Sequence, residues 1–178
     1  ATINETMNND SVTIIYLNKA IAAYRHLSDS THLAITYSNL AVSLKNIKRN
    51  EEALKYFTRS NRIARKTGNT NLLAVNKLNK GNLYEEKGNY KLAMTYYQGS
   101  LDISEKLSLT YGIYLNNINI ANLFYQKENY PPAIQLLKEA ISLNEKHNYD
   151  NNKATYKLLY NIYKAKANES KALHYLEL

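Results

Sequence analysis

The chain has 178 residues, of which 44% are hydrophobic and 21% are charged, and its formal net charge is +8. It is long enough to bury a core, and no apolar run approaches the roughly 20 residues that a membrane-spanning helix needs. The absence of cysteine excludes disulfide frameworks and thiolate metal sites, while the five glycines and two prolines favour long helices. We therefore expect an all-α protein. The absence of cysteine does not decide its compartment, because a bacterial cytoplasm and a periplasm both tolerate a helical protein without cysteine.

The two ends of the sequence differ from its middle. Residues 1–10 are expected to be a disordered or leading segment, and the apolar spacing of residues 11–28 predicts a helix. The start has no initiator Met, and residues 171–178 stop inside an apolar-periodic segment without a capping residue. We expect the sequence to be an excised domain of a longer protein.

Between these ends, one pattern recurs at intervals of about 40 residues. On each first helix a small residue stands three positions before a large apolar one, as in Ala41 and Leu44. On each second helix an alanine stands four positions before a large residue, as in Ala53 and Phe57. Between the helices, Gly or Asn can take the left-handed conformation and Pro can open the next helix. The pattern predicts a single array over residues 11–178, with hairpins at about 31–67, 71–107, 110–147 and 151–178, the last of them truncated.

The second unit carries the most specific signal. Its segments NKGNLY (79–84), KGNY (87–90) and AMTYY (93–97) resemble the tetratricopeptide repeat motif. The period of about 40 residues, rather than about 34, resembles the long-helix subclass of bacterial signalling regulators and eukaryotic polarity adaptors. The resemblance implies a right-handed superhelical array of antiparallel helix hairpins, an α-solenoid whose first helices line a concave groove. The sequence departs from the motif at Lys80, a charged residue at an apolar place, and in the last unit, which is one residue out of phase.

A second stripe on the first helices is rich in asparagine, with residues spaced three apart. Carboxamides donate and accept at once, which suits an extended peptide backbone. In the resembled family, Asn at four of these places commonly grips a ligand's main chain, namely Asn79, Asn82, Asn119 and Asn122. The residues expected to line the concave groove are Asn39, Asn76, Asn79, Asn82, Asn116, Asn119, Asn122 and Asn161, with Glu85 and Tyr125 one turn further on.

Two alternatives to this interpretation stay open. Asn is abundant in the chain and common in the family's motif, so part of the stripe can belong to the scaffold. Glu85 and Tyr125 can equally be solvated helix residues. A C-terminal carboxylate ligand is disfavoured, because Ser38, Leu78 and Ile118 stand where chaperone-tail binders would place lysine.

No pattern in the sequence predicts catalysis, a cofactor or a metal site. The chain has no Gly-Lys-Ser or Gly-Lys-Thr segment for phosphate binding. Its histidines are dispersed over different units, without a paired carboxylate at ligand spacing, at positions His26, His32, His147 and His174. We expect a protein that is not an enzyme.

One helix carries a basic stripe, made of Lys55, Arg59, Arg62, Arg65 and Lys66. It can be a solvated convex face, a nucleic-acid surface or a surface that attracts an acidic protein, and without a nucleic-acid motif we expect no nucleic acid. The leading hypothesis is a module that binds a protein or extended peptide, in the sensory or scaffolding region of a larger bacterial regulator. The alternative is a structural assembly factor that self-associates weakly through its terminal helices.

Overall fold

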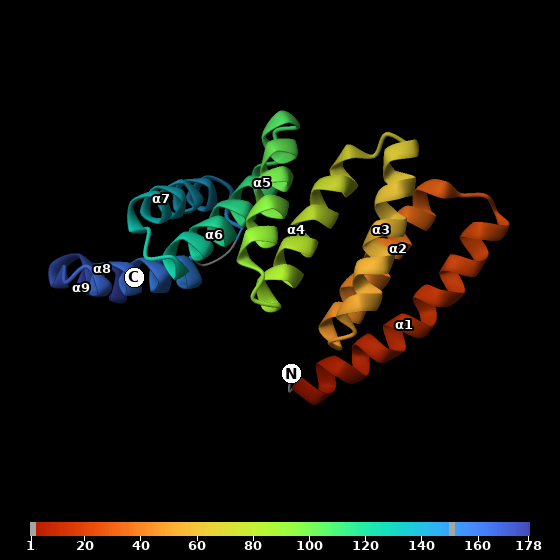
Figure 1. Cartoon of the computed structure of the whole chain (residues 1–178), viewed down its shortest axis with the longest axis horizontal. Coiled ribbons are helices and arrows are strands. Elements are labelled where there is room, and N and C mark those ends of the chain that lie inside the picture. The colour runs from red at the N-terminus through yellow and green to blue at the C-terminus, as the bar shows by residue number, and fades with distance from the viewer. Residues whose placement is uncertain (1–2, 150–151) are drawn as a thin grey trace. The chain divides into compact units, whose positions relative to one another are not determined.

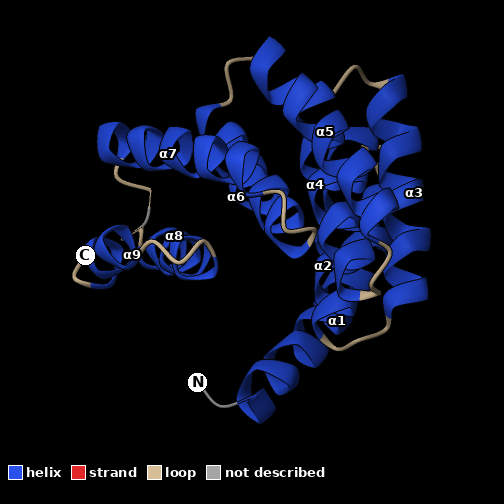
Figure 2. Ribbon diagram, turned by 60° about the vertical axis from the view of Figure 1, so that its left-hand side comes forward, coloured by secondary structure: helices blue, strands red, loops and turns tan. Residues whose placement is uncertain are grey.

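The computed structural model describes residues 3–149 and 152–178, which form helices joined by short turns (Figures 1 and 2). No strand occurs in these residues, so the predicted all-α repeat fold is confirmed. The helices in chain order are α1 (Ile3–His26), α2 (Ser30–Asn46), α3 (Asn50–Lys66), α4 (Thr70–Glu86), α5 (Tyr90–Lys106), α6 (Thr110–Gln126), α7 (Tyr130–His147), α8 (Lys153–Ala165) and α9 (Glu169–Leu176).

The chain divides into two compact units, Ala1–Asn89 and Tyr90–Leu178, where the sequence predicted a single array. The first unit contains α1 to α4, and the second contains α5 to α9. The boundary falls in the turn between α4 and α5, inside the hairpin predicted at 71–107.

Helix α1 includes most of the start of the chain. It begins at Ile3, so residues 3–10, predicted to be a disordered or leading segment, are helical and lead directly into the first hairpin. Residues 1 and 2 lie outside the described part of the chain, as does residue 151, where the last hairpin was predicted to begin. The helix predicted over residues 11–28 is present and ends at His26.

Seven turns between helices share one backbone geometry, and the connection from α7 to α8, which has left-handed residues at Asn148 and Asn152, differs from them. A residue in the left-handed conformation recurs at Ser28, Lys48, Gly68, Gly88, Ser108, Glu128 and Ala167, with φ between 52° and 73°. The next amide then donates back to a carbonyl of the preceding helix, as Arg49 N–H does to Leu44 O at 2.8 Å. This position takes glycine in only two of the seven turns, so the repeat is set by helix length more than by glycine.

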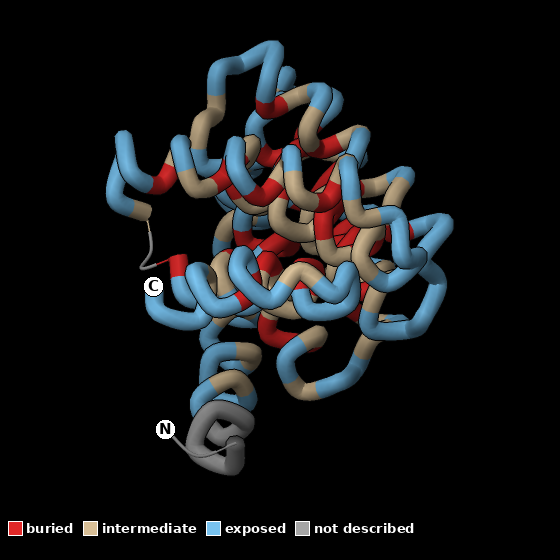
Figure 3. Tube along the Cα trace, turned by 90° about the vertical axis from the view of Figure 1, so that its left-hand side faces the viewer, coloured by how far each residue is buried: buried red, intermediate tan, exposed pale blue. Residues whose placement is uncertain are grey.

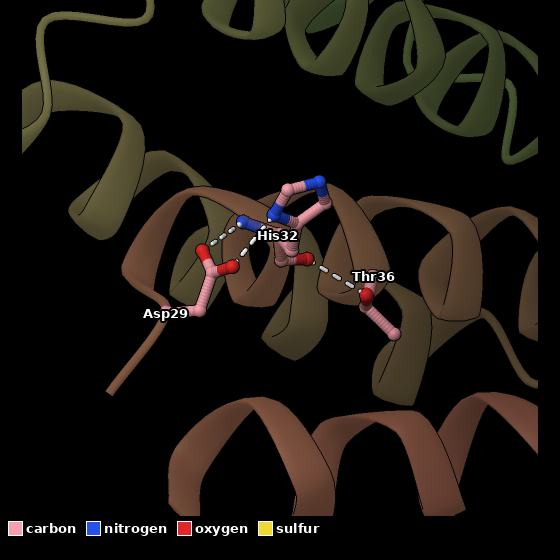
Figure 4. A network of polar contacts seen from close by, with 3 residues as sticks. All are labelled: Asp29, His32 and Thr36. Atoms are coloured by element: carbon pink, nitrogen blue, oxygen red, sulfur yellow. Dashed lines mark hydrogen bonds and ion pairs between the residues drawn. The ribbon is translucent and has the colours of Figure 1, made fainter. Parts of the chain in front are cut away.

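The asparagines of the turns within the hairpins do not take the left-handed conformation that the sequence suggested for them, whereas Asn148 and Asn152, between α7 and α8, do. They begin the following helix instead, as Asn168 does for α9, where its side chain accepts from Lys171 N–H at 3.1 Å. Asp29 does the same for α2: its Oδ1 accepts from His32 N–H at 3.0 Å, and its Oδ2 lies 2.7 Å from His32 Nδ1 (Figure 4). The backbone hydrogen bond from His32, followed by the bond from its side chain, lowers the pKa of Asp29. At the start of α7, Pro131 and Pro132 occupy the first turn, as predicted.

Each unit has its own apolar core, and buried residues recur at short intervals along the helices (Figure 3). In the first unit the core joins Leu40 and Leu44 of α2 to Phe57 of α3 and Leu83 of α4. In the second unit it joins Ala121, Ala133, Leu137, Leu159 and Ile162. The small residues predicted at the helix contacts are fully buried: Ala41, Ala53, Ala121 and Ala133.

Candidate ligand-binding surfaces

The first unit presents a polar strip on two neighbouring first helices, α2 and α4. Asn39 of α2 is exposed, and Asn79, Asn82 and Glu85 of α4 are partly exposed. Asn79 Nδ2 donates to Val75 O at 3.1 Å, within the same helix. We call these four residues, Asn39, Asn79, Asn82 and Glu85, the first polar strip.

The second unit presents a corresponding strip on α6 and α8. Asn119, Asn122 and Tyr125 of α6 and Asn161 of α8 are all partly exposed. The Tyr125 ring lies 6.2 Å from the ring of Tyr130, at the start of α7. These four residues form the second polar strip, so eight of the ten residues predicted for ligand binding lie on accessible helix faces.

Asn76 corrects the prediction, because it does not face a ligand surface. It is fully buried between helices of the first unit. Its Nδ2 donates to Ser60 Oγ and to Asn61 Oδ1, both at 2.8 Å, and its Oδ1 accepts from Ser38 Oγ at 2.6 Å. Ser60 Oγ in turn donates to Ala34 O at 2.8 Å. This network ties α4 to both helices of the preceding hairpin.

Asn116 is corrected in the same way. It is fully buried in the second unit, where its Nδ2 donates to Ser100 Oγ at 3.0 Å and to Gly112 O at 2.8 Å. The equivalent residue of α8 is Thr155, which is buried and whose Oγ1 has no hydrogen-bond partner. Residues three apart are separated by about 300° around a helix, which is about 60° short of a full turn. A stripe at that spacing therefore drifts around the helix. Its first member, Asn76 on α4 or Asn116 on α6, lies at the interface with the preceding hairpin.

Lys80 is the charged residue that the sequence places at an apolar position, and the structure buries it. Its Nζ donates to Thr58 Oγ1 at 3.2 Å. Burial lowers the pKa of Lys80, and the positive charges of Arg65 and Lys77 lower it further. The five residues of the basic stripe are exposed on α3, as a solvated face would be.

A cavity in the second unit was not found by sequence reasoning. It has a volume of about 530 Å³ and lies between α8 and the end of α9. Two lysines, three tyrosines, an asparagine and two leucines line it: Lys153, Lys157, Tyr156, Tyr160, Tyr175, Asn161, Leu176 and Leu178. Burial raises the pKa of Tyr175, with smaller contributions from Tyr163 and Tyr156. In the sequence, Leu176 follows Ala172 by four residues, as the core residues Phe57 and Leu137 follow Ala53 and Ala133. This spacing was the only feature of the sequence that pointed to the cavity.

The described residues contain neither a metal-binding cluster nor a membrane-spanning helix. Among them, no three His, Asp or Glu side chains are grouped so that they could hold a metal ion. In the same residues, no helix combines the length and the apolar character required to cross a membrane.

Known structures resemble the chain over most of its length. BtubC from P. vanneervenii aligns with a TM-score of 0.75 and 15% identity, covering 99% of this chain and 89% of that one. A putative kinesin light chain from Podosopora anserina with TPR-like repeats aligns with a TM-score of 0.68 and 16% identity, over 98% and 88% of the two chains. At these identities the likeness shows the fold alone.

The quorum sensor NprR from B. thuringiensis, in its apo form, is more similar in sequence. It is 26% identical, with a TM-score of 0.68, and the alignment covers 85% of this chain. This chain spans only 42% of the length of NprR. Among curated proteins, a sequence search finds no match.

A family model places the repeats directly. The model of the tetratricopeptide repeat matches residues 32–106 and again residues 70–146, which together extend from α2 through nearly all of α7. The matched segments agree with the hairpin geometry, the buried alanines and the recurrent turns. The chain belongs to the tetratricopeptide repeat family.

Proposed function

We propose that the chain is a protein-interaction module that binds an extended peptide segment along its polar strips. The observation that carries this proposal is the recurrence of exposed or partly exposed carboxamides at equivalent places of successive first helices. Asn39 of α2 and Asn79 of α4 correspond in the first unit, and Asn122 of α6 and Asn161 of α8 correspond in the second. Each carboxamide can accept from a peptide N–H and donate to a peptide C=O.

The scaffold under the first strip supports binding with little reorganisation. The buried Asn76 bonds to both helices of the preceding hairpin and so restrains α4 relative to α2 and α3. An exposed ion pair, Lys48 Nζ to Glu86 Oε2 at 3.0 Å, also joins the ends of α2 and α4. A preordered strip loses less conformational entropy when a ligand binds.

Side chains beside the carboxamides would select among peptide sequences. Lys45 of α2 and Glu85 of α4 stand at equivalent places in the first unit, and both are partly exposed. In the second unit those places carry Tyr125 and Lys164. The first unit thus offers one cation and one anion, while the second offers an aromatic ring and a cation.

We further propose that the module is the sensory or scaffolding region of a larger bacterial regulator. The support is the sequence identity to the quorum sensor NprR, which is 26%, against 16% for the kinesin light chain. The chain corresponds to less than half of NprR, so this context is a proposal about the whole protein.

The test uses two double variants, one for each strip: Asn79→Ala/Asn82→Ala and Asn119→Ala/Asn122→Ala. A matched control, Asn18→Ala/Asn71→Ala, removes two exposed asparagines outside the strips. Peptides are selected on the parent chain from a display library of random peptides, and their affinities are measured by calorimetry.

We expect at least one strip variant to bind a selected peptide about tenfold more weakly, which corresponds to the loss of one or two net hydrogen bonds. The control should bind like the parent, and all variants should keep their helical circular dichroism. Peptides that bind both strip variants as tightly as the parent would remove the strips as the binding surface.

A further inference from the structure

The positive charge of the chain is concentrated in one stretch of the first unit. Residues 53–84, which span most of α3 and α4, contain seven lysines and arginines and no aspartate or glutamate. The stretch therefore has a formal charge of +7, against +8 for the whole chain. Two of the carboxylates that flank it are engaged with other cations, since Glu52 pairs with Arg49 at 2.6 Å and Glu86 pairs with Lys48 at 3.0 Å. The seven cations are the five exposed residues of the basic stripe on α3 together with Lys77 and Lys80 of α4.

The repeat does not require this charge on its second helices. The positions equivalent to the basic stripe carry Thr95, Gly99, Asp102, Glu105 and Lys106 on α5, and Gln135, Glu139, Ser142, Glu145 and Lys146 on α7. All of them except Gly99 are exposed, like the stripe itself. Each of these two sets contains two carboxylates and one lysine, whereas the set on α3 contains five cations. Exposure of this face is thus common to α3, α5 and α7, and its strong positive charge is particular to α3.

The cations of the stripe lie in register along one side of α3. Lys55, Arg59, Arg62 and Lys66 follow one another at spacings of four, three and four residues, which keeps them on one face of the helix. At 1.5 Å per residue they extend over about 16 Å. The Arg59 guanidinium lies 5.0 Å from the centroid of the Tyr56 ring, a contact that restrains it. We call the side of α3 that carries this stripe the α3 face.

An open hollow lies within the α3 face, toward the start of the helix. Its volume is about 410 Å³, and it is lined by Leu54, Lys55, Thr58 and Arg59. Leu54 packs against the core of the first unit and gives the hollow an aliphatic part. Thr58 Oγ1 accepts from Lys80 Nζ at 3.2 Å, so a further cation lies beside the hollow. The hollow suits a large aliphatic side chain whose neighbours are carboxylates.

We propose that the α3 face binds an acidic amphipathic helix of a partner protein. The partner helix carries carboxylates at spacings of four, three and four residues, opposite the four cations of α3 that have the same spacings. An aliphatic residue between its carboxylates enters the hollow. This surface is separate from the polar strips, which lie on the first helices α2, α4, α6 and α8.

Two features of the α3 face favour a protein over a nucleic acid. A phosphate backbone has no aliphatic side chain to fill the hollow beside Leu54. In addition, α3 presents only one side to a ligand, because Ala53, Phe57 and Ala64 are fully buried against its neighbours. A helix packed in this way cannot lie in a major groove as a recognition helix does.

The sequence itself does not supply the acidic helix. No two of the acidic residues in the 178-residue chain stand four positions apart, so neither a segment of this sequence nor a second copy of it offers the required spacing. Two copies of the α3 face would also repel each other. Charge and spacing together therefore specify a different protein as the occupant.

The probe is a fluorescently labelled peptide that is chemically constrained as a helix, since short isolated helices are marginal in water. It carries four glutamates at spacings of four, three and four residues and a leucine three residues before the last glutamate, among alanines and glutamines. Three control peptides replace all glutamates by glutamine, replace the leucine by alanine, or shuffle the same composition so that the glutamates surround the helix. Binding to the whole chain is followed by fluorescence anisotropy.

We expect the glutamine and shuffled peptides to bind about tenfold more weakly than the probe, and the alanine peptide about three- to tenfold more weakly. The variant Arg59→Glu/Arg62→Glu should weaken the probe about tenfold or more. The matched control, Lys138→Glu/Lys146→Glu, makes the same change of charge at exposed positions of α7 and should bind the probe within about twofold of the parent. All variants should keep their helical circular dichroism, because the replaced side chains are exposed.

Five results would overturn the proposal. No binding of the probe, or equal binding of the probe and the shuffled peptide, would exclude a helix in register with α3. An equal loss in the α3 and α7 variants would assign the attraction to net charge alone. A DNA duplex of about 20 base pairs that displaces the probe at a lower concentration than the unlabelled probe does would assign the face to nucleic acid. A concentration-dependent dimer in sedimentation that Arg59→Glu/Arg62→Glu abolishes would assign it to a second copy of the chain.

Discussion

Replacing Asn76 by alanine should strongly destabilise the first unit, whereas replacing Asn79, one turn later on the same helix, should not. Asn76 is fully buried and makes three side-chain hydrogen bonds of 2.6 to 2.8 Å. Its removal leaves Asn61 Oδ1 and Ser38 Oγ without this partner inside the protein. At about 1 to 1.3 kcal/mol for each of the three lost bonds, the free energy of unfolding should fall by roughly 3 to 4 kcal/mol.

Asn79 supplies the matched comparison. Its side chain is partly exposed and bonds only to a carbonyl of its own helix. Alanine has a higher helix propensity than asparagine, by about 0.5 kcal/mol, so Asn79→Ala should change the free energy of unfolding by less than about 0.5 kcal/mol.

Urea unfolding followed by circular dichroism at the helical band measures both variants. With a urea dependence of about 2 kcal/mol per molar, Asn76→Ala should lower the transition midpoint by roughly 1.5 to 2 M. Asn116→Ala should give a smaller shift, because only its Nδ2 is hydrogen-bonded. If Asn76→Ala unfolds within about 0.5 kcal/mol of the parent, the network does not restrain α4, and the support that it gives to the first polar strip is lost.

Three further substitutions test other features of the fold. Lys48→Gly should raise the free energy of unfolding by about 1 kcal/mol, because Lys48 adopts φ 63°, a conformation that costs glycine less than lysine. Its ion pair with Glu86 is exposed, so the loss of that pair costs little. A melting temperature no higher than that of the parent would contradict this. Thr155→Val should stabilise the second unit by about 1 kcal/mol, since it removes a buried hydroxyl without a hydrogen-bond partner. Urea unfolding measures the change, and a destabilised variant would show that this hydroxyl is paired in solution. The lowered pKa of Lys80 means that the unfolded chain binds more protons than the folded one at alkaline pH, so stability should rise with pH between the folded pKa and the ordinary value of 10.5. Lys80→Met should raise the free energy of unfolding at neutral pH and diminish this alkaline rise, and parallel pH profiles for Lys80→Met and the parent would refute the assignment.

The spacing of apolar residues predicted the helices and their contacts well. An alanine four positions before a large side chain, as in Ala53 and Phe57, forms one stripe on a helix, and both residues are fully buried. This part of the fold depends on local periodicity, which a sequence shows directly. The turns were located correctly too, but the left-handed residue is Lys48 or Glu128 as often as glycine, so residue type alone does not predict which turn residue takes this conformation.

The binding residues were less predictable because exposure depends on neighbours. Asn76 and Asn79 are the same residue type on the same helix. The first is a structural amide because Ser38, Ser60 and Asn61 stand opposite it. A serine sixteen residues earlier was the available signal, and it recurs as Ser100 before Asn116. Leu176 has the same sequence pattern as Leu137, yet Leu176 is 62% exposed and Leu137 is fully buried, so this local pattern alone does not predict burial.

The buried Asn–Ser pairs also determine which hairpin can follow which. The contact between α3 and α4 and the contact between α5 and α6 each bury an amide that requires a hydroxyl opposite it. At the contact between α7 and α8 the equivalent residues are Ala140 and Thr155, which form no such bond. A copy of the α4–α5 hairpin begins with Asn76 and ends with Ser100, so it would form the same pairs if it followed α3 or α5. The same copy placed after α7 would set the amide of Asn76 opposite Ala140, without a hydroxyl partner. Duplication of repeats in this chain is therefore favoured before α6 and disfavoured after α7.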